Sequence, residues 1–180
     1  MRKTPFSTPL TDDEIYALGV TAFGYIETKD IRFSEEVRHI CKGNACGKYG
    51  KTWACPPGVG TYEECREKVL RYPSAFVFNG VYTLEDSFDF EGMIEGHRLF
   101  RKACRQLHEH IEQPYLLLSN EGCSNCKTCT YPDAPCRFPD KLFPSVEGYG
   151  ILVNKLAAAA GIKYINGVNT VTYFGMICFE

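Results

Sequence analysis

Residues 120–144 limit the fold of this chain more than any other stretch of its sequence. The segment holds four cysteines and four prolines in 25 residues, and it shows neither the period of a helix nor that of a strand. A structureless loop of more than about 12–15 residues is uncommon inside a compact domain. Something other than a hydrophobic core must therefore organise this segment, and its cysteines are the groups best suited to do so.

The cysteines of this segment have the spacing of a metal site. Cys123, Cys126, Cys129 and Cys136 form the pattern C-x2-C-x2-C-x6-C. Two-residue gaps place three thiolates around one corner of a cubane, as in bacterial ferredoxins. Here, however, six residues separate the third cysteine from the fourth, and Arg137 follows the fourth. Structural zinc sites more often join two separated C-x2-C pairs. We predict a [4Fe–4S] cluster on these four cysteines; zinc and a set of redox or structural thiols are the alternatives.

A second set of cysteines, Cys41, Cys46 and Cys55, lies in the segment 38–65. Four basic side chains share this window: Arg38, Lys42, Lys48 and Lys51. Positive charge favours thiolates or an anionic cluster nearby. We predict either a second metal site, with about eight irons per chain if it is also a cubane, or cysteines that complete the first site. A basic loop with buried free thiols is the alternative, and Cys65, in the first turn of a predicted helix, is the least suited fourth ligand.

Length, charge and the N-terminus restrict the class of protein. The chain has 180 residues, 44% of them hydrophobic, and a net charge of −2, which fits one metal-binding domain over residues 1–180 and gives no reason to expect nucleic-acid binding. No apolar run approaches the roughly 18 residues of a membrane span. The N-terminal residues do not read as a signal peptide, so we expect a cytoplasmic protein. In that reducing compartment, 10 cysteines indicate metal more than disulfides.

Strands and helices alternate along the chain, which predicts an α/β fold: one layered domain with a mixed sheet flanked by helices and a long cysteine-rich metal-binding loop. Capping boxes place helix starts at Thr11 and Thr61. The pattern predicts further helices over 87–112 and 145–160, and strands over 23–33, 74–83, 115–118, 162–165 and 171–179, the last two as a hairpin.

Two features of the predicted helices concern the cysteines. The helix expected from Val146 onward follows the cysteine loop directly, so its N-terminal N–H groups would suit an anionic cluster. Cys104 falls on the apolar stripe of the 87–112 helix, and Cys178 falls in the last strand. Both are expected in the core, because a free cysteine packs as a small hydrophobe. His97, on the same stripe, is expected to be a core histidine rather than a ligand.

Four motifs resemble those of a known family. CGKYGKTWACPP, GCSNCKTC, PCRFP and PSVEGYGI are similar to motifs of the cysteine-rich "predicted metal-binding protein" family, a domain of unknown function found mainly in anaerobic bacteria and archaea. The likeness extends from about residue 41 to 174, and Val146 departs from it where methionine is expected. It implies metal binding by the matching cysteines, which are Cys41, Cys46, Cys55, Cys123, Cys126, Cys129 and Cys136.

The residues together favour an iron–sulfur protein. We expect electron transfer to an anaerobic partner enzyme, or its reductive activation, with the basic segment 38–51 docking an acidic redox partner. A zinc-stabilised binding module without a redox role is the alternative. The sequence has no nucleophile–base pair, phosphate-binding loop or dinucleotide motif, so an enzyme acting on a small molecule has the least support.

Overall fold

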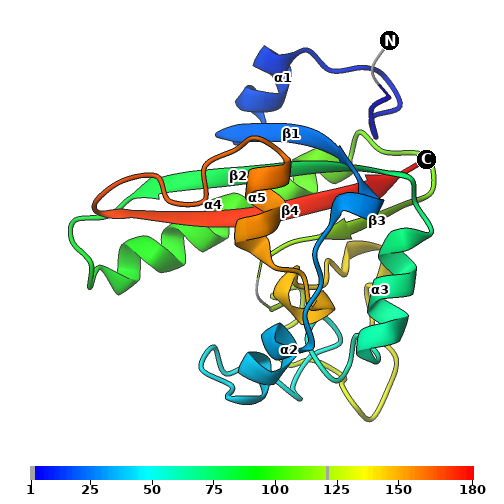
Figure 1. The fold of residues 1–180 in the computed structure, drawn as a ribbon. Helices are drawn as coiled ribbons and strands as arrows, with labels where there is room; N and C mark the ends of the chain where they lie inside the picture. Colours follow the sequence, from blue (N-terminus) through cyan, green and yellow to red (C-terminus); the bar gives the residue numbers. More distant parts are fainter. Residues whose placement is uncertain (1–2, 121) are drawn as a thin grey trace.

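A four-stranded sheet forms the centre of the computed structural model, which describes residues 3–120 and 122–180 (Figure 1). Its strands, in spatial order, are β1 (Ala22–Glu27), β2 (Ser74–Thr83), β4 (Thr170–Phe179) and β3 (Tyr115–Leu118). Helices cover both faces, which confirms the expected α/β layering. All three strand pairings are antiparallel, so the sheet is not mixed, and the parallel pairing found among the described residues is a single bridge between Ser119 and Ser145.

The long central strands divide the core into two layers. Successive side chains of a strand point to opposite faces, and here Phe76 and Phe78 of β2 pack on one side while Ala75 and Val77 pack on the other. β4 lies beside β2 along its whole length, from the Ser74–Phe179 pair to the Thr83–Thr170 pair. Where both faces of these strands are buried, at 75–78 of β2 and 176–179 of β4, every residue is apolar.

The first face is covered by α1 (Asp12–Ala17) and α4 (Phe90–His108). Phe100 and Cys104 of α4 are fully buried against the sheet, which confirms the core position of Cys104. The predicted apolar stripe is correct only for the second half of the helix, since Phe90 is 67% exposed and Ile94 70% exposed. The helix also begins later than residue 87, because the Asp89 carboxylate accepts a hydrogen bond from Gly92 N–H at 2.8 Å and caps it.

The second face is covered by α3 (Tyr62–Leu70), η3 (Glu147–Tyr149) and α5 (Val153–Ala159). Cys178 of β4 is fully buried there, which confirms its core position. Both predicted capping boxes, at Thr11 and at Thr61, are present.

The helix predicted over 145–160 was wrong, because the chain breaks between η3 and α5. Gly150 has a φ of +74°, a left-handed conformation that favours glycine, and a Cβ there would lie 2.7 Å from the Tyr62 ring. The following residue, Ile151, forms a bridge with Phe33. No extended helix N-terminus therefore faces the cysteine loop from Val146, although the Ser145 hydroxyl accepts a hydrogen bond from Gly148 N–H at 3.0 Å.

Residues 162–165 do not form the predicted strand, and the hairpin around 166–167 is absent from this described part of the chain. The reason lies in the sheet, because both edges of β4 are already taken by β2 and β3. The first strand is also shorter than 23–33, since η1 (Thr28–Asp30) follows β1.

The cysteine-rich segments gather on one side of the sheet. The short helix α2 (Glu35–Lys42) and the loops around it form the lower part of Figure 1, below the strands, whereas η2 (Pro139–Lys141) shares a cavity with β3. Within residues 3–120 and 122–180, none of the helices combines the length and apolar character that crossing a bilayer requires.

Candidate metal centre

The four cysteines of the 123–136 run line one cavity of about 420 Å³, which we call the loop cavity. Its other wall is the segment 47–53. No side chain between residues 123 and 142 is buried, so the loop has no apolar core of its own. Cys123, Cys126, Cys129 and Cys136 are all half-buried.

A small set of hydrogen bonds shapes this loop. Arg137 donates to the carbonyl of Thr128 at 2.9 Å, and Asn125 donates to the carbonyl of Lys141 at 2.6 Å. The indole N–H of Trp53 donates to Ala134 O at 3.1 Å and attaches the loop to the 47–53 segment. The Trp53 ring also meets Tyr131 edge-on, with centroids 4.8 Å apart.

The loop cavity has a strongly positive lining. Four basic side chains line it, and no acidic side chain is among its described lining residues; the basic ones are Lys48, Lys51, Lys127 and Arg137. Two of these, Lys48 and Lys51, belong to the basic window that the sequence associated with the other cysteines. Such a lining attracts anions, including a metal cluster whose thiolate ligands leave it negatively charged.

The second set of cysteines lines a different cavity of about 440 Å³, which we call the α2 cavity. Cys41 comes from the last turn of α2, Cys46 from the loop after it, and Cys55 from the segment before Pro56. Apolar and polar residues complete the lining: Val37, Ile40, Ala45, Pro56, Tyr49, Asn120, Ser145, Glu147, Thr172 and Tyr173. The two sets of cysteines therefore line different cavities among the described residues.

The environment of Cys41 and Cys55 shows how the second group is assembled. Burial raises the pKa of Cys41, the charges of Glu147, Cys46 and Cys55 raise this pKa further, and the charge of Arg38 lowers it. Burial also raises the pKa of Cys55, against the Thr52 hydroxyl, the Gly122 N–H and the Ser145 hydroxyl, which lower it. The Gly122 contact joins the two cavities, because Gly122 directly precedes the first cysteine of the loop.

Cys65 is not among the described residues that line either cavity. It is fully buried in the core, its thiol faces Val59 O at 3.6 Å, and Arg38 donates to its sulfur at 3.4 Å. Arg38 also donates to Gly60 O at 2.7 Å. Both the cysteine and the arginine therefore belong to the junction between α3 and the core.

Within the part of the chain that the structure describes, no three cysteine, histidine or acidic side chains lie close enough together to hold a metal ion as they stand. His97 is not a lining residue of either cavity as far as the chain is described, and its ring packs 5.5 Å from that of Tyr173.

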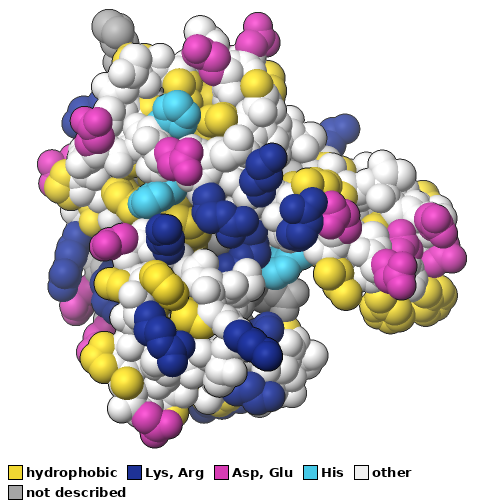
Figure 2. All heavy atoms as spheres, turned by 180° about the vertical axis from the view of Figure 1, so that it is seen from behind, with side chains coloured by type: hydrophobic (Ala, Val, Ile, Leu, Met, Phe, Trp, Pro, Cys, Tyr) yellow, Lys and Arg dark blue, Asp and Glu magenta, His cyan; other side chains and the backbone are white. Residues whose placement is uncertain are grey.

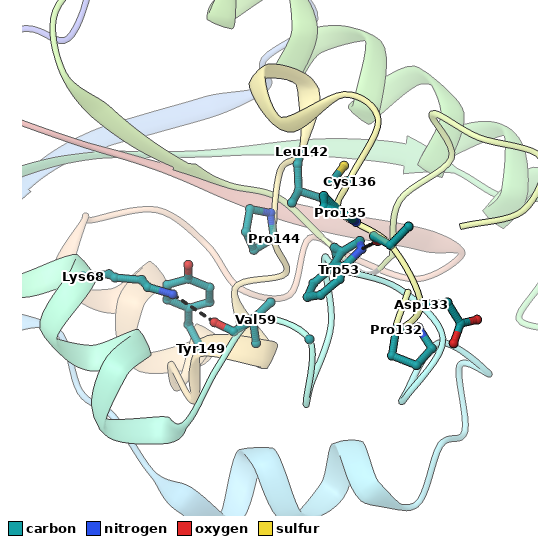
Figure 3. A pocket seen from close by; sticks show the side chains of 12 residues that line it. Trp53, Val59, Lys68, Pro132, Asp133, Pro135, Cys136, Leu142, Pro144 and Tyr149 are labelled. Atoms are coloured by element: carbon teal, nitrogen blue, oxygen red, sulfur yellow. Dashed lines mark hydrogen bonds between the residues drawn. The ribbon is translucent and has the colours of Figure 1, made fainter. Parts of the chain in front are cut away.

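A third cavity, of about 510 Å³, lies behind the cysteine loop and shares Trp53, Cys136 and Leu142 with the loop cavity. Figure 3 shows Trp53 in the middle of its lining, with Cys136 and Leu142 above and Lys68 and Tyr149 to one side. Lys68 donates to Val59 O at 3.0 Å, and burial raises the pKa of Tyr149. Trp53 thus separates two cavities.

Sequence reasoning missed several lining residues. Glu147 stands within the PSVEGYGI motif, and Trp53 stands within CGKYGKTWACPP. Both motifs were noticed for their cysteines and prolines, and neither suggested that these two side chains lie beside the cysteines. Nothing in the sequence indicated Asn120, whose position depends on where β3 ends.

The antiparallel sheet and its two cysteine-lined cavities define a cysteine-rich α/β protein with the donor groups of a metal-binding protein. The sequence model of the family described as predicted metal-binding protein (DUF2284) matches residues 24–179. The chain belongs to this family. No curated protein and no solved structure shows significant similarity to it.

Proposed function

We propose that this chain is an iron–sulfur protein that holds a [4Fe–4S] cluster on Cys123, Cys126, Cys129 and Cys136. One observation carries the proposal: all four thiols line a single cavity together with four basic and no described acidic side chains. Clusters of this type are held by four cysteine thiolates. The donor set and the charge of the loop cavity therefore both fit such a group.

The chain's own residues would serve the cluster in three ways. The cysteines hold it, while the lysines and arginine around them stabilise its negative charge, which is one determinant of the reduction potential. The Trp53 indole covers one wall and, through its bond to Ala134, holds the loop in place. A bound cluster supplies reversible one-electron chemistry. We propose that this chemistry serves electron transfer to, or reductive activation of, an anaerobic partner enzyme.

The charge distribution supports an acidic partner. Figure 2 shows lysine and arginine side chains gathered in the middle of the rear face and on the lower lobe, whereas acidic ones gather on the projecting lobe. Lys48 and Lys51 belong to the basic segment 38–51 and also line the loop cavity, so a partner docked there would lie beside the cluster. Such steering weakens with added salt. A reducing cytoplasm is the compartment in which these thiols would stay available for metal.

The test is metal analysis and spectroscopy of protein purified without oxygen. We expect about four irons and four sulfides in the loop cavity. We also expect a reversible one-electron reduction by low-potential donors, seen by electron paramagnetic resonance. Stoichiometric zinc without sulfide would overturn the cluster and favour a zinc-stabilised binding module. A cluster that cannot be reduced at any accessible reduction potential would overturn the proposed electron transfer but not the proposed cluster.

A further inference from the structure

We infer that the α2 cavity binds a neutral organic molecule that has an apolar body and a carbonyl oxygen. Asn120 recognises the oxygen, and the apolar side of α2 covers the body. The inference needs no metal on the cysteines of this cavity. It does not rest on the proposed cluster either, because the cysteines of the cluster line the loop cavity.

A buried amide in the lining points to the carbonyl oxygen. Asn120 lines the α2 cavity and is 5% exposed, and its Nδ2 atom has no hydrogen-bond partner among the described residues. Leaving a buried donor unpaired is costly. A ligand whose oxygen accepts a hydrogen bond from Nδ2 removes this cost, whereas a hydrocarbon does not.

The core holds the Asn120 side chain in place. Its Oδ1 atom accepts a hydrogen bond from the Ser119 hydroxyl at 3.2 Å, and that hydroxyl lies 3.3 Å from the sulfur of Cys104. All three residues are buried. Because the oxygen of the amide is already used by the core, its nitrogen is the group left to meet a ligand. The donor is thus positioned before a ligand binds, which lowers the entropic cost of binding.

The apolar side of α2 faces the cavity instead of the core. None of the residues of α2 is buried. Val37, Ile40 and Cys41 stand three and four residues apart, on one side of the helix, and all three line the cavity. Ile40 is 76% exposed. A short helix is stable in water mainly through the packing of its apolar side, and the apolar body of a ligand supplies this packing.

The size and the charge of the cavity restrict the ligand. Its volume of about 440 Å³ lies within the roughly 300–1,000 Å³ of small-molecule sites. Glu147 is the one acidic side chain of the described lining, which contains no basic side chain. Nothing there balances a carboxylate or a phosphate, and burying an unpaired charge is costly. A ketone, an ester or an amide therefore fits this cavity better than an anion.

The test compares three probes of similar size on the full-length protein as purified, with whatever metal its cysteines hold, since neither Asn120 nor Ile40 is a candidate metal ligand. Acetophenone carries the carbonyl group, ethylbenzene has a methylene group in its place, and benzoate has a carboxylate. Ligand-detected NMR titrations measure the affinities. We expect acetophenone to bind with a dissociation constant below about 1 mM. Benzoate should bind at least about tenfold more weakly, because its charge is unpaired in the cavity.

The role of the amide is tested with Asn120→Leu. Ethylbenzene should still bind to this variant, which shows that the cavity is intact. The ratio of the acetophenone affinity to the ethylbenzene affinity should fall about tenfold, because the variant no longer offers a donor to the carbonyl oxygen. A merely structural role of Asn120 would change both affinities together and leave their ratio unchanged.

The role of α2 is tested with Ile40→Ser. Because Ile40 is exposed, this variant should fold, as circular dichroism will check, yet bind acetophenone and ethylbenzene about fivefold more weakly through lost apolar contact. Ile165→Ser is the matched control. Ile165 is 78% exposed and is not among the described residues that line the α2 cavity, so its replacement should leave both affinities unchanged.

Four results would overturn the inference: no binding of acetophenone at millimolar concentration, benzoate binding as tightly as acetophenone, an unchanged affinity ratio in Asn120→Leu, or equal effects of Ile40→Ser and Ile165→Ser. Failure of the loop cluster shows up elsewhere, in the iron and sulfide content of the unaltered protein.

Discussion

Replacing Cys126 with alanine is expected to abolish the iron and sulfide that we propose for the loop cavity, because a methyl group cannot supply the missing thiolate ligand. The loss should be complete in iron and sulfide analysis and in the visible spectrum of protein purified without oxygen. Trp53, the single tryptophan of the chain, lines the same cavity and gives a second measurement. Its fluorescence should respond to cluster assembly in the unaltered protein and not in Cys126→Ala.

Cys104→Ala is the matched control. Cys104 is fully buried in the core, its sulfur lies 3.3 Å from the Ser119 hydroxyl, and it is not among the described lining residues of either cysteine-lined cavity. Its replacement should keep the metal and lower the free energy of unfolding by about 1 kcal/mol through lost packing. Equal loss of metal from Cys104→Ala and Cys126→Ala would contradict the division into core and ligand cysteines.

The largest effect on stability is expected for Phe100→Ala. The Phe100 ring is fully buried on the first face of the sheet, where it lies 5.6 Å from the ring of Phe78. Truncating a buried phenylalanine removes its packing and leaves a cavity, at a cost of about 3–5 kcal/mol. Chemical denaturation should measure this loss as a lower midpoint with an unchanged slope.

Phe90→Ala makes the same chemical change on the same helix. Because Phe90 is 67% exposed, its replacement should alter the free energy of unfolding by less than about 0.5 kcal/mol. Similar losses from the two variants would mean that the Phe90 ring is packed against another part of the protein, contrary to its exposure in the structure.

Local signals in the sequence predicted the elements that depend on local interactions. β2 occupies Ser74–Thr83, as the aromatic and β-branched run indicated, and β3 is Tyr115–Leu118 as predicted. The two capping boxes involve side chains within three residues of their partners, so the spacing alone identifies them.

The errors arose where distant segments decide the outcome. The 145–160 region has helical periodicity, yet the approach of Tyr62 and the bridge to Phe33 break it at Gly150. Periodicity also made residues 162–165 resemble a strand, but the sheet offers them no free edge on β4. The direction of the strands could not be predicted from the sequence either, because the antiparallel order depends on the path of the long connections between them.

In the candidate site, too, features set by nearby residues could be predicted and features set by distant segments could not. Cysteine spacing divided the thiols into two sets, and each set lines a cavity of its own. The direction of Lys48 and Lys51 could not be inferred, since it depends on the contact between the 47–53 segment and a loop about 80 residues further along. Glu147 and Asn120 likewise reach the α2 cavity only through the folded arrangement of η3 and β3.

The absence of buried side chains between residues 123 and 142 has a consequence for the life of the protein in the cell. The sheet is stabilised by apolar layers on both faces, whereas the loop depends on a few hydrogen bonds and, in our proposal, on its metal. The free energy of metal binding then stabilises the folded state of this loop alone. During iron starvation the loop would open while the sheet stayed intact, and proteases would cut it there first. The abundance of the intact chain would therefore follow the metal supply.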